Sequence, residues 1–191
     1  MFQLIDFIIV KPIINILFVI FSIPLFTIGP ALTAAYNTIF KWMKEKEASI
    51  FKNFINGFKN NFKQSVIIWI PFLIFIVSLS AALRWTHLVL DESYRFMQYP
   101  ISIAIFLLLC IINYVFPQVA VFKQKTMIII SNSVLLALAN FPTTILMIFV
   151  PVFIYLVAGL SPEMTIMVFS LLLFFGIALI AYFYSIFFSP F

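Results

Sequence analysis

Long apolar runs dominate the chain, and their lengths predict helices that cross a membrane. Continuous apolar stretches of near 20 residues alternate with short polar segments. A hydrocarbon core about 30 Å thick needs about 20 helical residues to cross it, whereas a β-barrel strand would alternate apolar and polar positions. The pattern therefore predicts an all-α fold, a polytopic transmembrane helical bundle that forms one membrane domain over residues 1–191. We expect about five spans, at about residues 13–40, 64–83, 100–122, 141–160 and 162–184.

The first of these spans is too long for a straight helix and contains two prolines. A helix over residues 13–40 would be roughly 42 Å long, more than the bilayer core requires. Pro24 and Pro30 each remove a backbone donor, so we expect a proline-broken first helix with a kink or short unwound segment at Thr27–Pro30. Either the kink serves helix packing, with Ala31, Thr33, Ala34 and Ala35 as a small-residue face that another helix can approach closely, or the freed backbone groups line a binding site, as in transporters. The residues of this candidate functional break are Thr27, Gly29, Pro30 and Thr33.

Residues 49–62 carry phenylalanines at spacings of three and four, which is one face of an α-helix. We expect a cytoplasmic interfacial helix with its phenylalanines in the acyl boundary and its lysines among anionic headgroups. It either connects two spans as a simple elbow or forms a docking surface for a cytoplasmic partner. The residues of this docking or lipid face are Phe51, Lys52, Phe54, Phe58, Lys59, Phe62 and Lys63. A second interfacial or re-entrant helix is expected at 126–139, which is apolar but too short to span.

The placement of charge predicts the orientation in the membrane. Lysines cluster at 41–63 and 123–125, and such clusters mark the cytoplasmic side of a membrane protein. The loop at 84–99 has balanced charges, and the turn at 161–163 is acidic, so both are expected outside. With five spans, the N-terminus would lie outside and the C-terminus inside. The lysines flank apolar spans rather than forming a basic domain, so we expect no nucleic acid partner despite a net charge of +5.

Composition agrees with a membrane location and gives few polar groups to the spans. The chain is 65% hydrophobic and 9% charged, whereas a soluble domain has about 25% charged residues. The third span contains two amides, Asn113 and Gln118. A buried amide in lipid is expected to form a hydrogen bond to a neighbouring helix and less often to a substrate.

We searched the sequence for catalytic and metal-binding patterns. It contains no H-E-x-x-H, no G-x-S-x-G and no glycine-rich phosphate loop. Its six acidic residues stand at the ends of predicted spans or in loops, and its one cysteine allows neither a disulfide within the chain nor a thiol metal site. We therefore expect a protein that is not an enzyme and that needs no cofactor and no metal.

Four segments together resemble the YesL-like family of bacterial membrane proteins, a domain of unknown function. These segments are PLFTIGPALTAAY at 24–36, FKNFINGFKNNFKQS at 51–65, YVFPQVAVFKQ at 114–124 and SNSVLLALANFPTTI at 131–145. The family usually has a glycine after the lysine turn, where this chain has Lys44-Glu45-Lys46-Glu47-Ala48. Genes of the family often lie beside carbohydrate ABC-transporter and sensor genes, so the resemblance implies a role in sugar uptake or sensing without a mechanism.

Two hypotheses for function follow. In the first, the protein is an accessory or regulatory component of bacterial carbohydrate uptake or sensing, which engages an ABC-transporter permease or a sensor kinase through its basic inner face. In the second, it is a small permease for a neutral solute such as a sugar, acting as a homo-oligomer. Its site would then lie at Thr27–Pro30, with amides from Asn113 and Gln118. The lack of acids within the spans argues against an ion-coupled permease.

Overall fold

The predicted all-α class is confirmed for the part of the chain that the structure describes. The computed structural model describes residues 2–45, 49–88 and 96–158, together with 161, 163, 165, 166 and 176. Its elements are α1 (Phe2–Ser22), the short 3-10 helix η1 (Leu25–Thr27), α2 (Ile28–Glu45), α3 (Ile50–Leu88), α4 (Gln98–Val121), α5 (Thr126–Ala139) and α6 (Phe141–Ala158).

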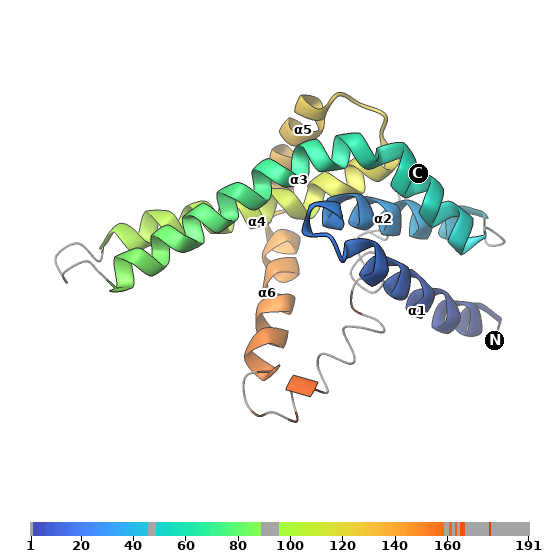
Figure 1. Ribbon diagram of the computed structural model, residues 1–191, viewed down its shortest axis with the longest axis horizontal. Helices are drawn as coiled ribbons and strands as arrows, with labels where there is room; N and C mark the ends of the chain where they lie inside the picture. Colours follow the sequence, from blue (N-terminus) through green and yellow to red (C-terminus); the bar gives the residue numbers. More distant parts are fainter. Residues whose placement is uncertain are drawn as a thin grey trace.

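Helices α1 and α2 form a hairpin rather than one kinked span. Figure 1 shows that they run in opposite directions from the break at η1, so that the start of α1 and the end of α2 lie on the same side of the molecule. Ile14 and Leu17 of α1 pack in one cluster with Ala35 and Ile39 of α2, as a chain that folds back on itself requires. The prediction of a single span over residues 13–40 is therefore wrong. We call residues 2–45 the N-terminal hairpin.

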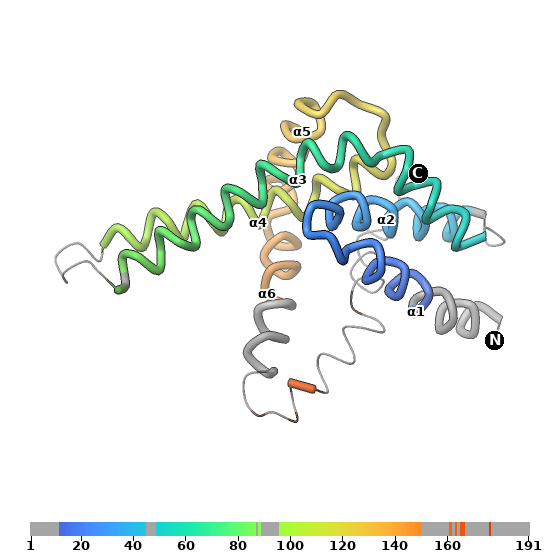
Figure 2. The backbone as a smooth tube through the Cα atoms, in the orientation of Figure 1, coloured from blue at the N-terminus to red at the C-terminus, as the bar shows by residue number. Residues whose placement is uncertain are grey.

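Helix α3 joins two elements that the sequence pattern separates. The amphipathic stretch 49–62 and the expected span 64–83 belong to one continuous helix, Ile50–Leu88. At 1.5 Å per residue this helix is roughly 58 Å long, about twice the thickness of a hydrocarbon core. Its amphipathic part bends over α2, and its apolar part pairs with α4 to form a long hairpin that projects from the rest of the molecule (Figures 1 and 2).

The core of the molecule lies around α2. Five side chains of this helix are completely buried, and all are small: Ala31, Thr33, Ala34, Ala35 and Thr38. Small side chains let neighbouring helices approach closely, and α1, α3 and α4 all pack against α2. The small-residue face predicted after Pro30 is therefore the centre of the fold.

Helices α5 and α6 match the segments expected from the sequence, at 126–139 and 141–160, but they form a sharp corner. Their axes differ by 93° across Asn140, which makes them either one broken span or a re-entrant segment. Phe141–Ala158 runs across the direction of the α3–α4 hairpin (Figure 1). The expected fifth span, 162–184, lies almost entirely outside the described residues.

Among the described residues, two helices are long and apolar enough to cross a membrane: α3, over Ile50–Thr86, and α4, over Gln98–Val121. A third crossing is added if α5 and the first half of α6 count as one span. The count of five spans is not confirmed. The apolar half of α3 leaves many large side chains on the surface, among them Ile67, Ile74 and Phe75. Such a face is stable in lipid and costly in water, which agrees with a membrane location.

The N-terminal hairpin changes the expected topology. Its tip is strongly apolar and exposed at Ile23, Leu25 and Phe26. Trp69, which contacts this tip, lies five residues beyond Gln64, or roughly 8 Å along α3. We therefore expect the hairpin to enter the membrane from the lysine-rich side and to turn back within that leaflet, which would put the start of α1 on the same side as Ser49.

Cysteine labelling in a Cys110→Ser background tests this topology. Gln3→Cys and Ser49→Cys should react with a membrane-impermeant maleimide from the same side of the membrane, and Phe96→Cys from the opposite side. Cells and inverted vesicles provide the two sides. Labelling of Gln3→Cys from the same side as Phe96→Cys would contradict the re-entrant hairpin and restore a crossing by the first segment.

Candidate functional site

The break in the N-terminal hairpin lies a few residues earlier than predicted. Helix α1 ends at Ser22, Pro24 is extended with φ −76° and ψ 121°, and η1 leads into α2. Gly29 and Pro30 fall in the first turn of α2. The amide of a residue in that turn has no partner within the helix, so a proline there starts a helix and does not interrupt it. The prediction of an unwound Thr27–Pro30 segment is therefore wrong for its last residues.

The backbone acceptors at the break are bound by donors of the protein itself. The Thr27 hydroxyl lies 2.6 Å from the carbonyl oxygens of both Phe21 and Pro24, and its amide donates to Pro24 at 2.9 Å. The indole Nε1 of Trp69 on α3 donates to the carbonyl oxygen of Leu25 at 2.8 Å. Carbonyls that are already paired are not available to a solute. This geometry favours the packing interpretation of the break over the binding-site interpretation.

Gly29 lies at the point where α2 comes closest to α3 and α4. A Cβ atom built on Gly29 would lie 2.7 Å from the Cβ atom of Trp69 and 3.1 Å from Cε1 of Phe116. One turn later, the buried Thr33 hydroxyl lies 2.8 Å from the Ser65 hydroxyl of α3. The four residues of the candidate break thus lie close together at one end of α2, where they join helices.

The two amides of α4 have different roles from each other. Asn113 donates to the carbonyl oxygen of Leu109 at 2.7 Å. This bond lies within its own helix and does not reach a neighbouring helix as expected. Gln118 is buried and donates to the Ser133 hydroxyl of α5 at 2.6 Å, as expected of a buried amide. The polar side chains of the third predicted span are therefore engaged within the protein.

Further hydrogen bonds connect helices to one another or to the linker after α4, and they were not anticipated. Asn37 of α2 donates to the carbonyl oxygen of Ala120 at 3.0 Å, and Tyr114 of α4 lies 2.7 Å from Thr144 of α6. Gln64 of α3 donates to the backbone carbonyl oxygen of Gln124, in the linker after α4, at 2.8 Å. The available signal was the presence of single polar residues in strongly apolar segments, but no pattern in the sequence gives their partners.

The phenylalanine face of the amphipathic segment points into the protein. Phe54 is completely buried, and its ring centre lies 5.4 Å from that of Phe21 in α1. Phe58 also packs on Phe21, at 4.9 Å, and Phe62 packs on Phe58. The prediction that the phenylalanines enter the acyl boundary does not hold for Phe54 and Phe58, because the N-terminal hairpin covers them. Phe51, at the start of α3, is 58% exposed.

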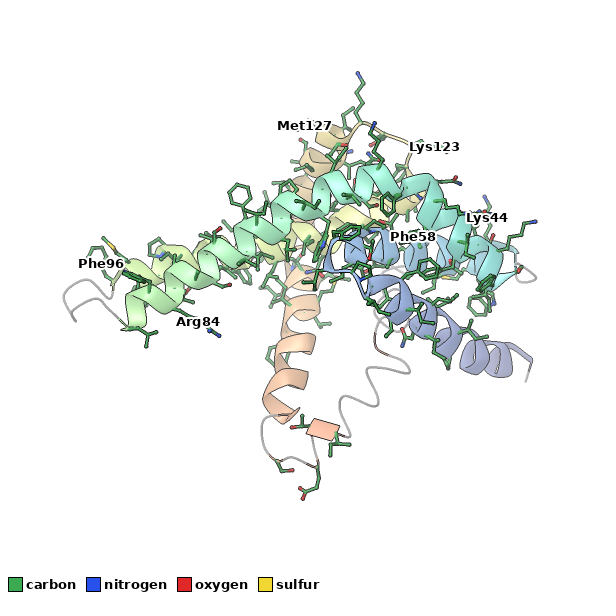
Figure 3. The ribbon with its side chains drawn as sticks, viewed as in Figure 1. Lys44, Phe58, Arg84, Phe96, Lys123 and Met127 are labelled. Atoms are coloured by element: carbon green, nitrogen blue, oxygen red, sulfur yellow. The ribbon has the colours of Figure 1, made fainter. Side chains whose placement is uncertain are left out.

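The lysines of this segment are exposed, and they belong to a basic end of the molecule. Figure 3 shows Lys44 and Lys123 at the end where the N-terminal hairpin packs, while Arg84 and Phe96 lie at the far end of the α3–α4 hairpin. The exposed lysines at this end are Lys44, Lys52, Lys59, Lys63, Lys123 and Lys125. We call this set the basic face.

The described residues form a helical protein built on a small-residue hairpin, with two to three helices long and apolar enough to cross a membrane. Residues 12–81 match the model of a protein family of unknown function, DUF624. The match covers α1 from Pro12, the break, α2 and α3 as far as Ala81, so it contains the contacts around Gly29. No curated protein sequence matches the chain, and no solved structure matches it either. The wider YesL-like resemblance, which includes residues 114–145, stays a prediction.

Substitution of the two packing glycines should destabilise the protein to different degrees. Gly29→Ala places its methyl group 2.7 Å from the Trp69 Cβ atom, whereas Gly57→Ala meets Asn37 at 3.1 Å. We expect Gly29→Ala to lower stability by about 1–3 kcal/mol, typical of overpacking, and Gly57→Ala to cost less. Thermal unfolding of the purified protein in detergent measures both. Equal midpoints for Gly29→Ala and the unsubstituted chain would show that α2 and α3 separate easily.

Removal of the indole donor should loosen the break. Trp69→Phe keeps an aromatic ring but leaves the Leu25 carbonyl oxygen without the 2.8 Å bond. We expect a loss of about 0.6–2 kcal/mol, as for other hydrogen bonds between membrane helices. Trp85→Phe, on the exposed far part of α3, is the matched control and should be neutral. The comparison uses proteolysis near the break as well as thermal unfolding, and equal behaviour of the two variants would remove this role from Trp69.

Proposed function

We propose that the protein is an accessory or regulatory membrane component that engages a partner through the basic face, in bacterial carbohydrate uptake or sensing. The observation that carries the proposal is the exposure of lysines on the outer side of α3, opposite the buried Phe54. The carbohydrate context is supported by the resemblance to YesL-like proteins, whose genes often lie beside sugar transporters and sensors. The partner of this proposal is an ABC-transporter permease or a sensor kinase.

The position of Lys52 and Lys59 supports a partner that is a protein. Lys52 stands 12 residues before Gln64, which lies two residues before the apolar run that starts at Val66, and this separation corresponds to roughly 18 Å of helix. The chain between them packs on the N-terminal hairpin through Phe54 and Phe58. The lysines on its outer side are thus held on a rigid, folded surface, and such surfaces lose little conformational entropy on binding.

The permease hypothesis has less support. It requires free polar groups at the break or on α4, and the carbonyls of Phe21, Pro24 and Leu25 already accept hydrogen bonds. Gln118 is bound to Ser133. Gly29→Leu is not a clean test of transport, because the larger side chain would disrupt packing. Asn113→Leu is cleaner, because the Asn113 amide donates within its own helix, to the carbonyl oxygen of Leu109.

Charge reversal on the outer side of α3 tests the accessory role. Lys52→Glu with Lys59→Glu should reduce recovery of the partner in a pull-down from native membranes by about tenfold or more, because like charges across an interface are strongly unfavourable. Lys52→Arg with Lys59→Arg keeps the charge and should retain the partner. Arg84→Glu, at the far end of α3, controls for a general effect of charge reversal.

Partner recovery in the pull-down and sugar flux through the purified protein together separate the two hypotheses. Unchanged partner recovery with the Glu variant would remove the docking role from this part of the basic face. Sugar flux through the purified protein in vesicles, lost in Asn113→Leu, would instead establish the permease. Mass spectrometry of the co-purified material identifies the partner in the first case.

A further inference from the structure

Three lysines surround one hydrogen bond between α3 and the linker that joins α4 to α5. Gln64 Nε2 of α3 donates to the backbone carbonyl oxygen of Gln124 at 2.8 Å. Lys63 precedes the first residue of this pair, and Lys123 and Lys125 flank the second. All three lysine side chains are exposed. Because a lysine has a long, flexible stem, three ammonium groups that start around one hydrogen bond can reach a single ligand.

This hydrogen bond lies where the apolar parts of two helices begin and end. The apolar run of α3 starts at Val66, two residues after Gln64, and the apolar run of α4 ends at Phe122, directly before Lys123. The bond to Gln124 therefore places the start of the apolar run of α3 and the end of the apolar run of α4 side by side, at one level along the α3–α4 hairpin. In a protein whose α3 and α4 cross the bilayer, that level is the one of the headgroups on the basic side.

Apolar side chains stand exposed beside the three lysines. Val121 ends α4 and Phe122 follows it, while Met127 and Ile128 lie in the first turn of α5. All four side chains are exposed, and Met127 is 80% exposed. Lys123 and Met127 lie along the same edge of the molecule (Figure 3). A soluble anion makes no favourable contact with an apolar surface. A phospholipid can pack its acyl chains against this surface and place its phosphate beside the lysines.

No acid on the neighbouring chain segments neutralises these lysines. The sequence has no Asp or Glu between Glu47 and Asp91, and none between Glu92 and Glu163. Three ammonium groups around one point repel one another, and an anion placed among them turns this repulsion into attraction. The cluster is therefore chemically suited to a phosphate group with a negative charge.

We infer that Lys63, Lys123 and Lys125 form a binding site for the phosphate of an anionic phospholipid, with its acyl chains against Phe122 and Met127. Gln64 positions the site by holding the linker on α3. The site adjoins the docking lysines on the outer side of α3, because Lys59 lies four residues before Lys63, or roughly 6 Å along the helix, but it uses a set of lysines that does not include Lys52 and Lys59. The inference does not depend on the accessory function.

Lipid binding by the purified full chain tests the inference. Phosphatidylglycerol and phosphatidylcholine with the same acyl chains are added to the protein in detergent, and bound lipid is measured by native mass spectrometry alongside thermal unfolding. We expect preferential binding of phosphatidylglycerol. Each Lys→Gln change at positions 63, 123 or 125 should weaken it roughly fivefold, and all three together by on the order of a hundredfold.

Two matched variants distinguish a built site from diffuse positive charge. Lys44→Gln, Lys52→Gln and Lys59→Gln together remove the same charge from the basic face and should keep the preference for phosphatidylglycerol. Gln64→Leu removes no charge but frees the linker, and it should weaken binding severalfold. Equal weakening by the two triple variants, or no effect of Gln64→Leu, would overturn the site.

The source of the phosphate is settled with soluble probes. Inorganic phosphate and glycerol 3-phosphate should stabilise the protein little compared with phosphatidylglycerol, because they make no contact with Phe122 and Met127. Full competition by either probe would overturn the lipid assignment. Since the three lysines are exposed, the variants should unfold at the normal temperature in phosphatidylcholine, and the single substitutions give the same test if the triple variant does not fold. The inference would also be refuted if Lys63, Lys123 and Lys125 were needed for binding of a protein partner while the purified protein bound no phospholipid.

Discussion

The close approach of α2 to α3 and α4 is the contact on which the rest of the structure depends. In lipid, helices gain little from hiding apolar surface from one another, so they associate by tight packing and by hydrogen bonds. The small residues of α2 provide the first, with Gly29 against Trp69 and Phe116. The Thr33–Ser65 contact provides the second. Once α2 is held in this way, α1 has only one direction in which to fold, and it covers Phe54 and Phe58.

The same physical rule explains the break between α1 and α2. A chain that reverses within a membrane exposes backbone groups that must find partners in the protein. Here Thr27 serves the carbonyls of α1 and of Pro24, and Trp69 reaches over from α3 to serve Leu25. The break is thus closed by the helix that α2 packs against, and the DUF624 match covers all of these residues together. The break and the side chains that close it therefore form one structural unit within the matched region.

Local patterns predicted the elements well and their arrangement poorly. The helix at 126–139, the helix at 98–121 and the small-residue face of α2 follow from apolar run length and from side-chain size, which are properties of neighbouring residues. The hairpin does not follow, because a proline pair indicates a break but not the direction after it. The phenylalanine stripe of α3 was assigned to lipid for the same reason. Its periodicity correctly gives a face, but only the position of Phe21 decides that protein covers it. The amides were found as polar residues in apolar runs, but only the fold decides that Gln118 bonds to Ser133 of α5 and that Asn113 bonds within α4.

The basic face combines two surfaces that differ in their depth relative to the membrane. In the proposed arrangement, the outer side of α3 up to Lys59 lies before the start of the apolar run, so it would face the aqueous phase and the proposed protein partner. Lys63, Lys123 and Lys125 lie at the boundary itself, where Gln64 holds two chain segments together. Lysines at that level meet lipid phosphates before any other anion, because the bilayer is always present and a partner is not. An occupied lipid site would fix the linker after α4 and hence the start of α5, and it would leave Lys52 and Lys59 as the free positive charges that a partner encounters.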